Sequence, residues 1–354
     1  MRDAVTRETL AVRNSVGILD ASTLGKIDIH GPDASKLLNL IYTNEWDSLP
    51  VGHCRYGLML GEDGMIFDDG VTSRLADNHY LMTTTSGNAA RVLEWLEEWL
   101  QTEWPKFHVY CTSVTEHWAN ITICGPYARA LLDELTDDID LSPNAFPFMT
   151  WREGKVGGVP ARVFRVSFTG EVSYEINIPA SFALSLWTSI INAGDKYGIT
   201  PFGTEAMHIL RAEKGYIIVG HETDGTVTPN DLGMNWAISK QKDFIGKRSL
   251  SRSDTASLDR KQLVGLLPKD QRKVLPEGGQ ITTQKNRLNS VPMEGHVTSS
   301  YHSPNLNQPF ALALLKNGRS RHGETVYIPL NQETLEATVT SPVLYDPNGE
   351  KLHA

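Results

Sequence analysis

Apolar residues recur at helical spacing in several segments of the chain. Residues 33–41 place Leu37, Leu38 and Ile41 on one face, and Asp33 can cap the first turn. The other predicted helices cover residues 87–101, 125–135, a stretch beginning near Ala180, and 203–215. The segment 87–101 has an apolar stripe with its glutamates mostly off it, and the segment 203–215 closes at a glycine.

Strand-like alternation lies between these helices. Residues 118–124 alternate around Ile121 and Ile123, and residues 161–168 and 174–178 flank a turn at 169–171. Helices and strands are therefore interleaved up to about residue 250, which is an α+β pattern.

The pattern changes after residue 250. Residues 249–261 are polar and lack an apolar stripe, which indicates a domain boundary. Short strand-like runs punctuated by Gly, Pro and Asn follow: LVGLL, FALALL, ETVYIPL and EATVTS. We therefore expect an α+β part over residues 1–250 and a small all-β barrel or sandwich over residues 251–354.

Composition narrows the class of protein. The chain has 354 residues, of which 40% are apolar and 21% charged, with a net charge of -9, so a basic nucleic-acid surface is not expected. Its 3 cysteines lack CxxC spacing, which disfavours a disulfide framework or zinc site and fits a reducing cytoplasm. The N-terminus lacks the apolar core of a signal peptide, and residues 176–194 are too polar for a membrane span.

Several common motifs are absent from the sequence. There is no GxGxxG, no phosphate loop, no HExxH and no GxSxG. The chain therefore shows no flavin or nicotinamide site of its own, and linked redox chemistry would sit on another chain. His208 and His221 have no second ligand at metal-binding spacing, so no metal site is expected.

Three acidic residues lie in apolar strand-like surroundings. Asp68 and Asp69 are adjacent, so a strand would point them to opposite faces, one to a cavity and the other to solvent or a backbone donor. From spacing alone, a turn followed by a strand edge is the favoured interpretation of the pair. Glu175 is costly on an apolar strand unless it meets donors, either a ligand with two adjacent N–H groups or an arginine such as Arg211.

Taken in order, several segments resemble the aminomethyltransferase family, whose type member is the T-protein of the glycine cleavage system. They are GEDGMIFDDGV, ITICGPYARALL, VSFTGEVSYEI, LRAEKG and SPVLYDP. The most specific segment carries Asp224, Thr228-Pro229, Gly233 and Trp236, followed by FIGK. Within the family, RYGLMLGEDGMIFDDGVTSRL is similar to the folate-binding part of the sarcosine oxidase α subunit. The resemblance implies a cloverleaf of three subdomains around a folate cavity, the last a β-barrel.

The resemblance also implies site residues. The family's catalytic acid falls on Asp69, with Asp68 beside it, and the pterin-binding glutamate falls on Glu175. Phe168 and Tyr174 take the positions of aromatic residues near the pterin. The remaining implied cofactor-binding residues are Arg211 and Tyr345.

The chain departs from the family pattern in two respects. Met207 stands where T-proteins carry a folate-contacting arginine, so that contact is missing or rerouted. The full α subunit has a long N-terminal part with dinucleotide-binding folds, whereas this chain starts at the folate part. It is expected to be a fragment or a stand-alone relative.

The implied function is tetrahydrofolate-dependent one-carbon transfer. A flavin elsewhere oxidises an N-methyl amine such as sarcosine, and tetrahydrofolate captures the carbon as 5,10-methylenetetrahydrofolate. The implied partners are folate, a small methylated amine and, as in sarcosine oxidase, a flavin-bearing subunit. The alternatives are a stand-alone aminomethyltransferase or demethylase, a scaffold with a degenerate site, and a non-catalytic folate module. Residues 214–217 lack the cysteine of the KGCYxGQE motif found in the module's iron–sulfur assembly relatives.

Overall fold

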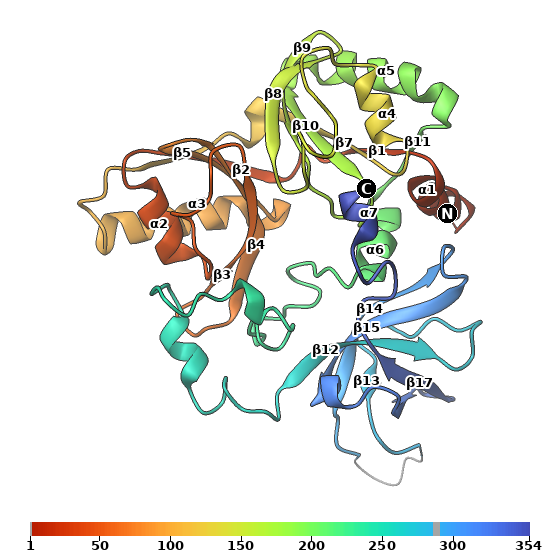
Figure 1. Ribbon diagram of the computed structural model, residues 1–354. Helices are drawn as coiled ribbons and strands as arrows, with labels where there is room; N and C mark the ends of the chain where they lie inside the picture. Colours follow the sequence, from red (N-terminus) through yellow and green to blue (C-terminus); the bar gives the residue numbers. More distant parts are fainter. Residues whose placement is uncertain (1, 286–290) are drawn as a thin grey trace.

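The computed structural model describes residues 2–285 and 291–354, which form three lobes, each built on one sheet (Figure 1). The first lobe has a 5-stranded antiparallel sheet in the order β3-β4-β5-β2-β6. Its strands are β2 (Gly25–His30), β3 (Cys54–Leu60), β4 (Ile66–Ala76), β5 (His79–Thr84) and β6 (Tyr110–Ser113). Helices α2 (Ala34–Ile41) and α3 (Ala89–Thr102) bury their predicted apolar stripes against this sheet.

The second lobe has a 6-stranded sheet in the order β11-β1-β7-β10-β9-β8. Its strands are β1 (Gly17–Asp20), β7 (Trp118–Cys124), β8 (Trp151–Val156), β9 (Val159–Phe164), β10 (Ser173–Pro179) and β11 (Thr200–Pro201). Helices α4 (Ala128–Asp133) and α5 (Ala183–Gly194) pack on one face of it. Helices α1 (Arg2–Asn14) and α6 (Thr204–Glu213) pack on each other through Val12, Ala206 and Leu210.

The third lobe is a β-barrel. Its 6 strands, in the order β13-β14-β15-β12-β17-β16, are β12 (Lys261–Pro268), β13 (Gln280–Ile281), β14 (Gly295–Ser303), β15 (Gln308–Lys316), β16 (Thr325–Pro329) and β17 (Thr334–Thr340). The two ends of this order meet, because Thr282 and Tyr327 exchange backbone hydrogen bonds of 2.8 and 2.9 Å. The expected α+β architecture with a C-terminal barrel is confirmed.

The short elements complete the description. The last helix, α7 (Glu350–His353), returns to the second lobe, where Arg165 donates to the carbonyl of Leu352 at 2.8 Å. The 3₁₀ helices are η1 (Ser86–Asn88), η2 (Thr115–His117), η3 (Ala180–Phe182), η4 (Asp195–Tyr197), η5 (Asn235–Ala237), η6 (Lys247–Ser251) and η7 (Gly318–Ser320). Within the described ranges, no helix has the length and apolar character needed to cross a membrane.

Two local expectations were wrong. Asp33 does not cap its own helix, because its carboxylate accepts from the backbone N–H of His108 at 2.8 Å and from Lys36 at 2.6 Å. The helix expected over 125–135 covers only Ala128–Asp133. Gly125 has φ of 125° and belongs to the preceding turn, so the helix starts later.

A buried ionic network joins parts of the chain that are distant in sequence. The guanidinium of Arg13 on α1 contacts Glu171 at 2.9 Å and Glu213 at 2.7 Å. Tyr345 donates to Glu171 at 2.7 Å, and Ser303 donates to Glu213 at 2.5 Å. The network therefore fixes α1, the turn before β10, α6, the barrel and the C-terminal segment against one another.

Candidate functional site

A β-bulge in β4 controls where the two adjacent aspartates point. Met59 pairs with Asp68, but Leu60 pairs with Ile66, so Phe67 is the extra residue. From Asp68 onward the strand alternates normally, and Asp68 and Asp69 lie on opposite faces, as the sequence predicts.

Asp68 is fully buried on the face covered by the helices. Its carboxylate accepts from the backbone N–H of Thr85 at 3.3 Å and from the amide of Asn88 at 3.4 Å. Burial raises the pKa of Asp68 to about 6, and these donors oppose the shift. The contacts tie β4 to the start of α3.

Asp69 lies on the face turned toward the second lobe. Neighbours on that face, Cys54 and Val71, pack against Trp151 and Phe164 of the second lobe. The hydroxyl of Tyr56 donates a hydrogen bond to the carboxylate of Asp69 at 2.6 Å. Among the described residues, no other side chain forms a hydrogen bond with Asp69. Burial raises the pKa of Asp69 to about 7, and the nearby charge of Asp68 adds to the effect. A carboxyl with such a pKa can accept or release a proton near neutrality.

Glu175 lies on β10 and faces the first lobe. Its register partners are Thr122 on β7 and Phe164 on β9. The side-chain amide of Asn120 donates a hydrogen bond to Oε2 of Glu175 at 2.9 Å. No other side chain in the described part of the chain forms a hydrogen bond with Glu175. Burial raises the pKa of Glu175. The hydrogen bond from Asn120 and the positive charge of Lys26 lower this pKa, but by less. Oε1 therefore remains open to a further donor.

Lys26 is a fully buried cation connected to Glu175, and sequence reasoning missed it. Its ammonium donates to the carbonyls of Ser22 at 2.9 Å and Leu24 at 3.0 Å. The hydroxyl of Ser22 accepts from the backbone N–H of Asn120 at 3.0 Å, and Asn120 holds Glu175. Burial lowers the pKa of Lys26, and Glu175 is the strongest charge opposing that shift. The available signal was a lysine in the strand-like run GKIDIH.

Two of the remaining implied residues do not join the acids. Tyr174 is 0% exposed and packs in the core beside Phe146, because strand alternation turns it away from Glu175. Arg211 is also fully buried, and its guanidinium contacts Glu222 at 2.7 Å, so the proposed pairing of Arg211 with Glu175 was wrong.

The other implied residues lie elsewhere. Phe168 is 37% exposed and stacks on Tyr216 with ring centres 6.2 Å apart. Tyr345 binds Glu171 and lies under the guanidinium of Arg13, 4.0 Å from its ring centre. Met207, in place of the family arginine, packs beside the apolar cluster between α1 and α6.

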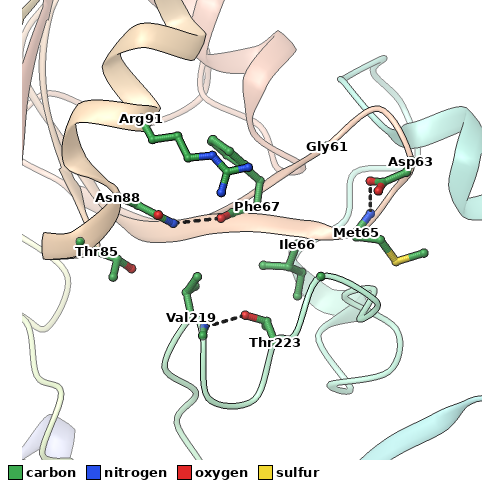
Figure 2. Close-up of a pocket in the computed structure, with 13 residues that line it drawn as sticks. Gly61, Asp63, Met65, Ile66, Phe67, Thr85, Asn88, Arg91, Val219 and Thr223 are labelled. Atoms are coloured by element: carbon green, nitrogen blue, oxygen red, sulfur yellow. Dashed lines mark hydrogen bonds between the residues drawn. The ribbon is translucent and has the colours of Figure 1, made fainter.

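A cavity of about 440 Å³ adjoins the Asp68 side of β4 (Figure 2). The lining residues are Gly61, Asp63, Met65, Ile66, Phe67, Thr85, Gly87, Asn88, Arg91, Val219, Gly220, Thr223 and Gly225. Thr85 and Asn88 thus contact Asp68 and also form the wall of the cavity. In the described residues no cluster of three or more His, Cys, Asp or Glu side chains could hold a metal.

Comparison with known proteins identifies the family to which the chain belongs. Residues 1–242 match the GCVT N-terminal domain, and residues 261–346 match the glycine cleavage T-protein C-terminal barrel domain. The chain belongs to the glycine cleavage T-protein family. Its fold matches the crystal structure of glycine cleavage system aminomethyltransferase T from Bartonella henselae with a TM-score of 0.84 and 25% identity, covering 97% of this chain and 90% of that one.

Relatives in the family carry two kinds of name. Sarcosine oxidase subunit alpha from Corynebacterium sp. (strain P-1) is 53% identical over 99% of this chain, but the chain covers only 37% of that protein. The aminomethyltransferase from Clostridium botulinum (strain Okra / Type B1) is 30% identical over 94% of this chain and 87% of its own length. The chain therefore spans about a third of its sarcosine oxidase relatives and most of an aminomethyltransferase.

Proposed function

We propose that this chain binds tetrahydrofolate between the first and second lobes and supports one-carbon transfer to it. The observation that carries the proposal is the pair of acids on facing sheets, Asp69 and Glu175, each held by one protein side chain. The family membership and the names of the relatives support the same function.

The chemistry of these residues fits a reduced pterin. Glu175 is partly buried with one carboxylate oxygen open, and a buried carboxylate is costly until its donors are complete. A pterin presents an amino group beside a ring N–H, and these two donors match one carboxylate in a bidentate way. Asp69 also keeps capacity to accept a further donor.

The two acids have different roles in the proposal. Bound tetrahydrofolate supplies the nitrogens between which a one-carbon unit is carried, giving 5,10-methylenetetrahydrofolate as product. Glu175 orients the ring by accepting its N–H groups. Asp69 offsets the positive charge of the incoming iminium. The iminium carbon becomes bonded to two folate nitrogens as its bond to the donor amine breaks; of the two folate N–H protons lost, one goes to the departing amine and Asp69 takes up the other. Tyr56 holds the Asp69 carboxylate in position for both tasks.

Two isosteric variants test these roles. We expect Glu175→Gln to weaken tetrahydrofolate binding by about 1–3 kcal/mol, the scale of a lost charged hydrogen bond, as measured by calorimetry. Asp69→Asn should keep folate affinity but lose about 10²–10⁴-fold in transfer rate. Unchanged affinity in the first variant or normal turnover in the second would refute the corresponding role.

The carbon donor in this proposal is an N-methyl amine such as sarcosine. The 53% identical relative named sarcosine oxidase subunit alpha supports that choice and suggests a flavin-bearing oxidase subunit as partner. Turnover assays with sarcosine plus an oxidase, dimethylglycine, and an aminomethyl-lipoyl carrier distinguish the donors. Activity with the lipoyl carrier alone would favour a stand-alone aminomethyltransferase instead.

A scaffold with a degenerate folate site is the second candidate. Met207 favours it, because an apolar side chain occupies the position of a folate-contacting family arginine. This candidate predicts no folate binding and no turnover with any donor.

A further inference from the structure

Two polar side chains lie beside Glu175 on the same face of the second sheet. Asn177 follows Glu175 by two residues on β10, so strand alternation places both on the face turned toward the first lobe. Arg162 on β9 pairs with Asn177, as Phe164 pairs with Glu175. Arg162 and Glu175 are therefore diagonal neighbours on adjacent strands (Figure 1), about 7–8 Å apart between Cα atoms and within reach of long side chains.

The opposite charges of Arg162 and Glu175 nevertheless do not pair. The guanidinium of Arg162 lies 4.4 Å from the ring centre of Trp118, and over the ranges 2–285 and 291–354 it forms no ion pair. Its Nη1 atom is buried, and no described residue accepts a hydrogen bond from it. Glu175 is held by Asn120 instead. An arginine this close to a carboxylate is well suited to a bidentate ion pair, so the structure keeps the guanidinium open to another acceptor.

Asn177 is the second polar group without a partner. The residue is 2% exposed, and its Oδ1 atom is buried with no hydrogen bond from the described part of the chain. A buried donor or acceptor that stays unpaired is unfavourable, which favours a bound molecule that supplies what is missing. The missing partners are an acceptor for Arg162 and a donor for Asn177.

We infer that Arg162 and Asn177 bind an α-amino acid with an N-methyl group, the carbon donor of the proposed function. A carboxylate is a preferred acceptor for a guanidinium, and the amine N–H of the same molecule is a donor for Oδ1 of Asn177. The inference rests on the proposed function, in which the donor amine departs beside a pterin held by Glu175. An aminomethyl group on a lipoyl carrier has an amine but no carboxylate, so it would leave Arg162 unpaired.

Three small amines test the two contacts separately, and without an oxidase none of them is converted. Sarcosine carries both groups, N-methylethylamine lacks the carboxylate, and glycine betaine lacks the N–H. With tetrahydrofolate present, we expect the wild-type chain to bind sarcosine about 10-fold more tightly than either of the other two, as measured by NMR titration.

Single variants assign each contact. Arg162→Gln should remove the preference for sarcosine over N-methylethylamine, and Arg162→Lys should keep part of it. Asn177→Leu should remove only the preference over glycine betaine. Arg91→Gln is the matched control, because the guanidinium of Arg91 also lies over an aromatic ring, that of Phe67, with no ion pair to any described residue. This control should keep both preferences.

Each other outcome has a definite meaning. An Arg162→Gln variant that still prefers sarcosine over N-methylethylamine overturns the inference, and so does loss of that preference in Arg91→Gln. If Arg162→Gln does not fold, as seen by circular dichroism, Asn177→Leu decides, and an unchanged preference over glycine betaine overturns the inference. A wild type that binds tetrahydrofolate but does not distinguish the amines overturns the inference alone. A wild type that does not bind tetrahydrofolate overturns the proposed function as well.

Discussion

At the scale of single residues, two adjacent aspartates of the same strand have different surroundings. Asp68 accepts two hydrogen bonds from the start of α3, whereas Asp69 has one side-chain donor and faces the second lobe. Their sequence positions are equivalent, and only the bulge and the packing separate them. Asp68 is therefore tied to the start of α3, and the proposed function assigns the chemistry to Asp69.

The raised pKa of Asp69 predicts a pH-dependent stability. Its carboxyl titrates near pH 7 in the folded chain and near its ordinary value of 3.8 when unfolded, so the folded state binds more protons in between. The free energy of unfolding should therefore fall as pH rises from about 4 to about 7. Asp69→Asn should reduce this slope in urea titrations and leave the part due to Asp68, whose pKa is raised to about 6, whereas the exposed control Asp137→Asn should keep the whole slope. An unchanged slope in Asp69→Asn would contradict the raised pKa.

Lys26 predicts a pH effect on ligand binding. Its charge lowers the pKa of Glu175, and the Glu175 carboxylate must be ionised to accept pterin donors. Lys26→Met should shift the midpoint of pH-dependent folate binding to higher pH, and Lys26→Arg should restore it. The negative charges of Asp20 and Glu116 also raise the pKa of Lys26, and the charge of Glu175 raises the pKa of Cys54. These three residues should therefore stay unchanged in the experiment. An even loss of affinity at every pH would indicate a packing role only.

At the scale of elements, strand alternation separates core from site on β10. Tyr174 and Ile176 enter the core, while Glu175 faces the first lobe. On β4, close contact between strands matters as well. A Cβ on Gly70 would lie 1.9 Å from the carbonyl oxygen of Thr83 on β5, so only glycine allows this approach beside Asp69.

Gly70→Ala should therefore separate β4 from β5 next to Asp69. We expect a loss of about 1–3 kcal/mol in the free energy of unfolding, together with reduced transfer activity. The control is Gly203→Ala, where the nearest atom to the new Cβ is 3.9 Å away. Equal stability of the two variants would show that β4 tolerates the displacement.

Local pattern predicted some features and not others. The period of two placed Asp68 and Asp69 on opposite faces, and apolar stripes marked α2 and α3, because these signals lie within one element. The partner of Arg211 is Glu222 rather than Glu175, and Asp33 binds His108 rather than its own helix. Such pairings depend on the tertiary packing of separate elements, which no local pattern encodes. The cavity beside α3 and the buried Lys26 were not predicted for the same reason.

At the scale of the whole molecule, Arg13 is the centre of the network that joins α1 and the second lobe to α6 and the barrel. Its side chain and those of Glu171 and Glu213 are at most 2% exposed. Removing one partner of a buried ionic group leaves the others uncompensated, which typically costs 3–5 kcal/mol. Tyr345, implied as a folate residue, instead binds this network in the structure.

Arg13→Met should therefore lower the free energy of unfolding by about 3–5 kcal/mol, seen as a lower urea midpoint. Arg7→Met, an exposed change on the same helix, should be nearly neutral. Combining Arg13→Met with Glu171→Gln and Glu213→Gln should recover part of the loss, because the stranded charges are gone. A single variant as stable as the wild type would contradict the role of the network.

The same network has a consequence for how the chain folds. Arg13 is separated by 158 residues from Glu171 and by 200 from Glu213, and Glu171 is separated by 174 from Tyr345. Contacts this distant in sequence form late and slow folding, because long loops must close first. During synthesis at roughly 5–20 residues per second, α1 leaves the ribosome many seconds before its partners. Until residue 345 emerges, the guanidinium of the first helix stays in water. The sheet that carries Glu175 can therefore form early, but it is fixed to α6, the barrel and the C-terminal segment last.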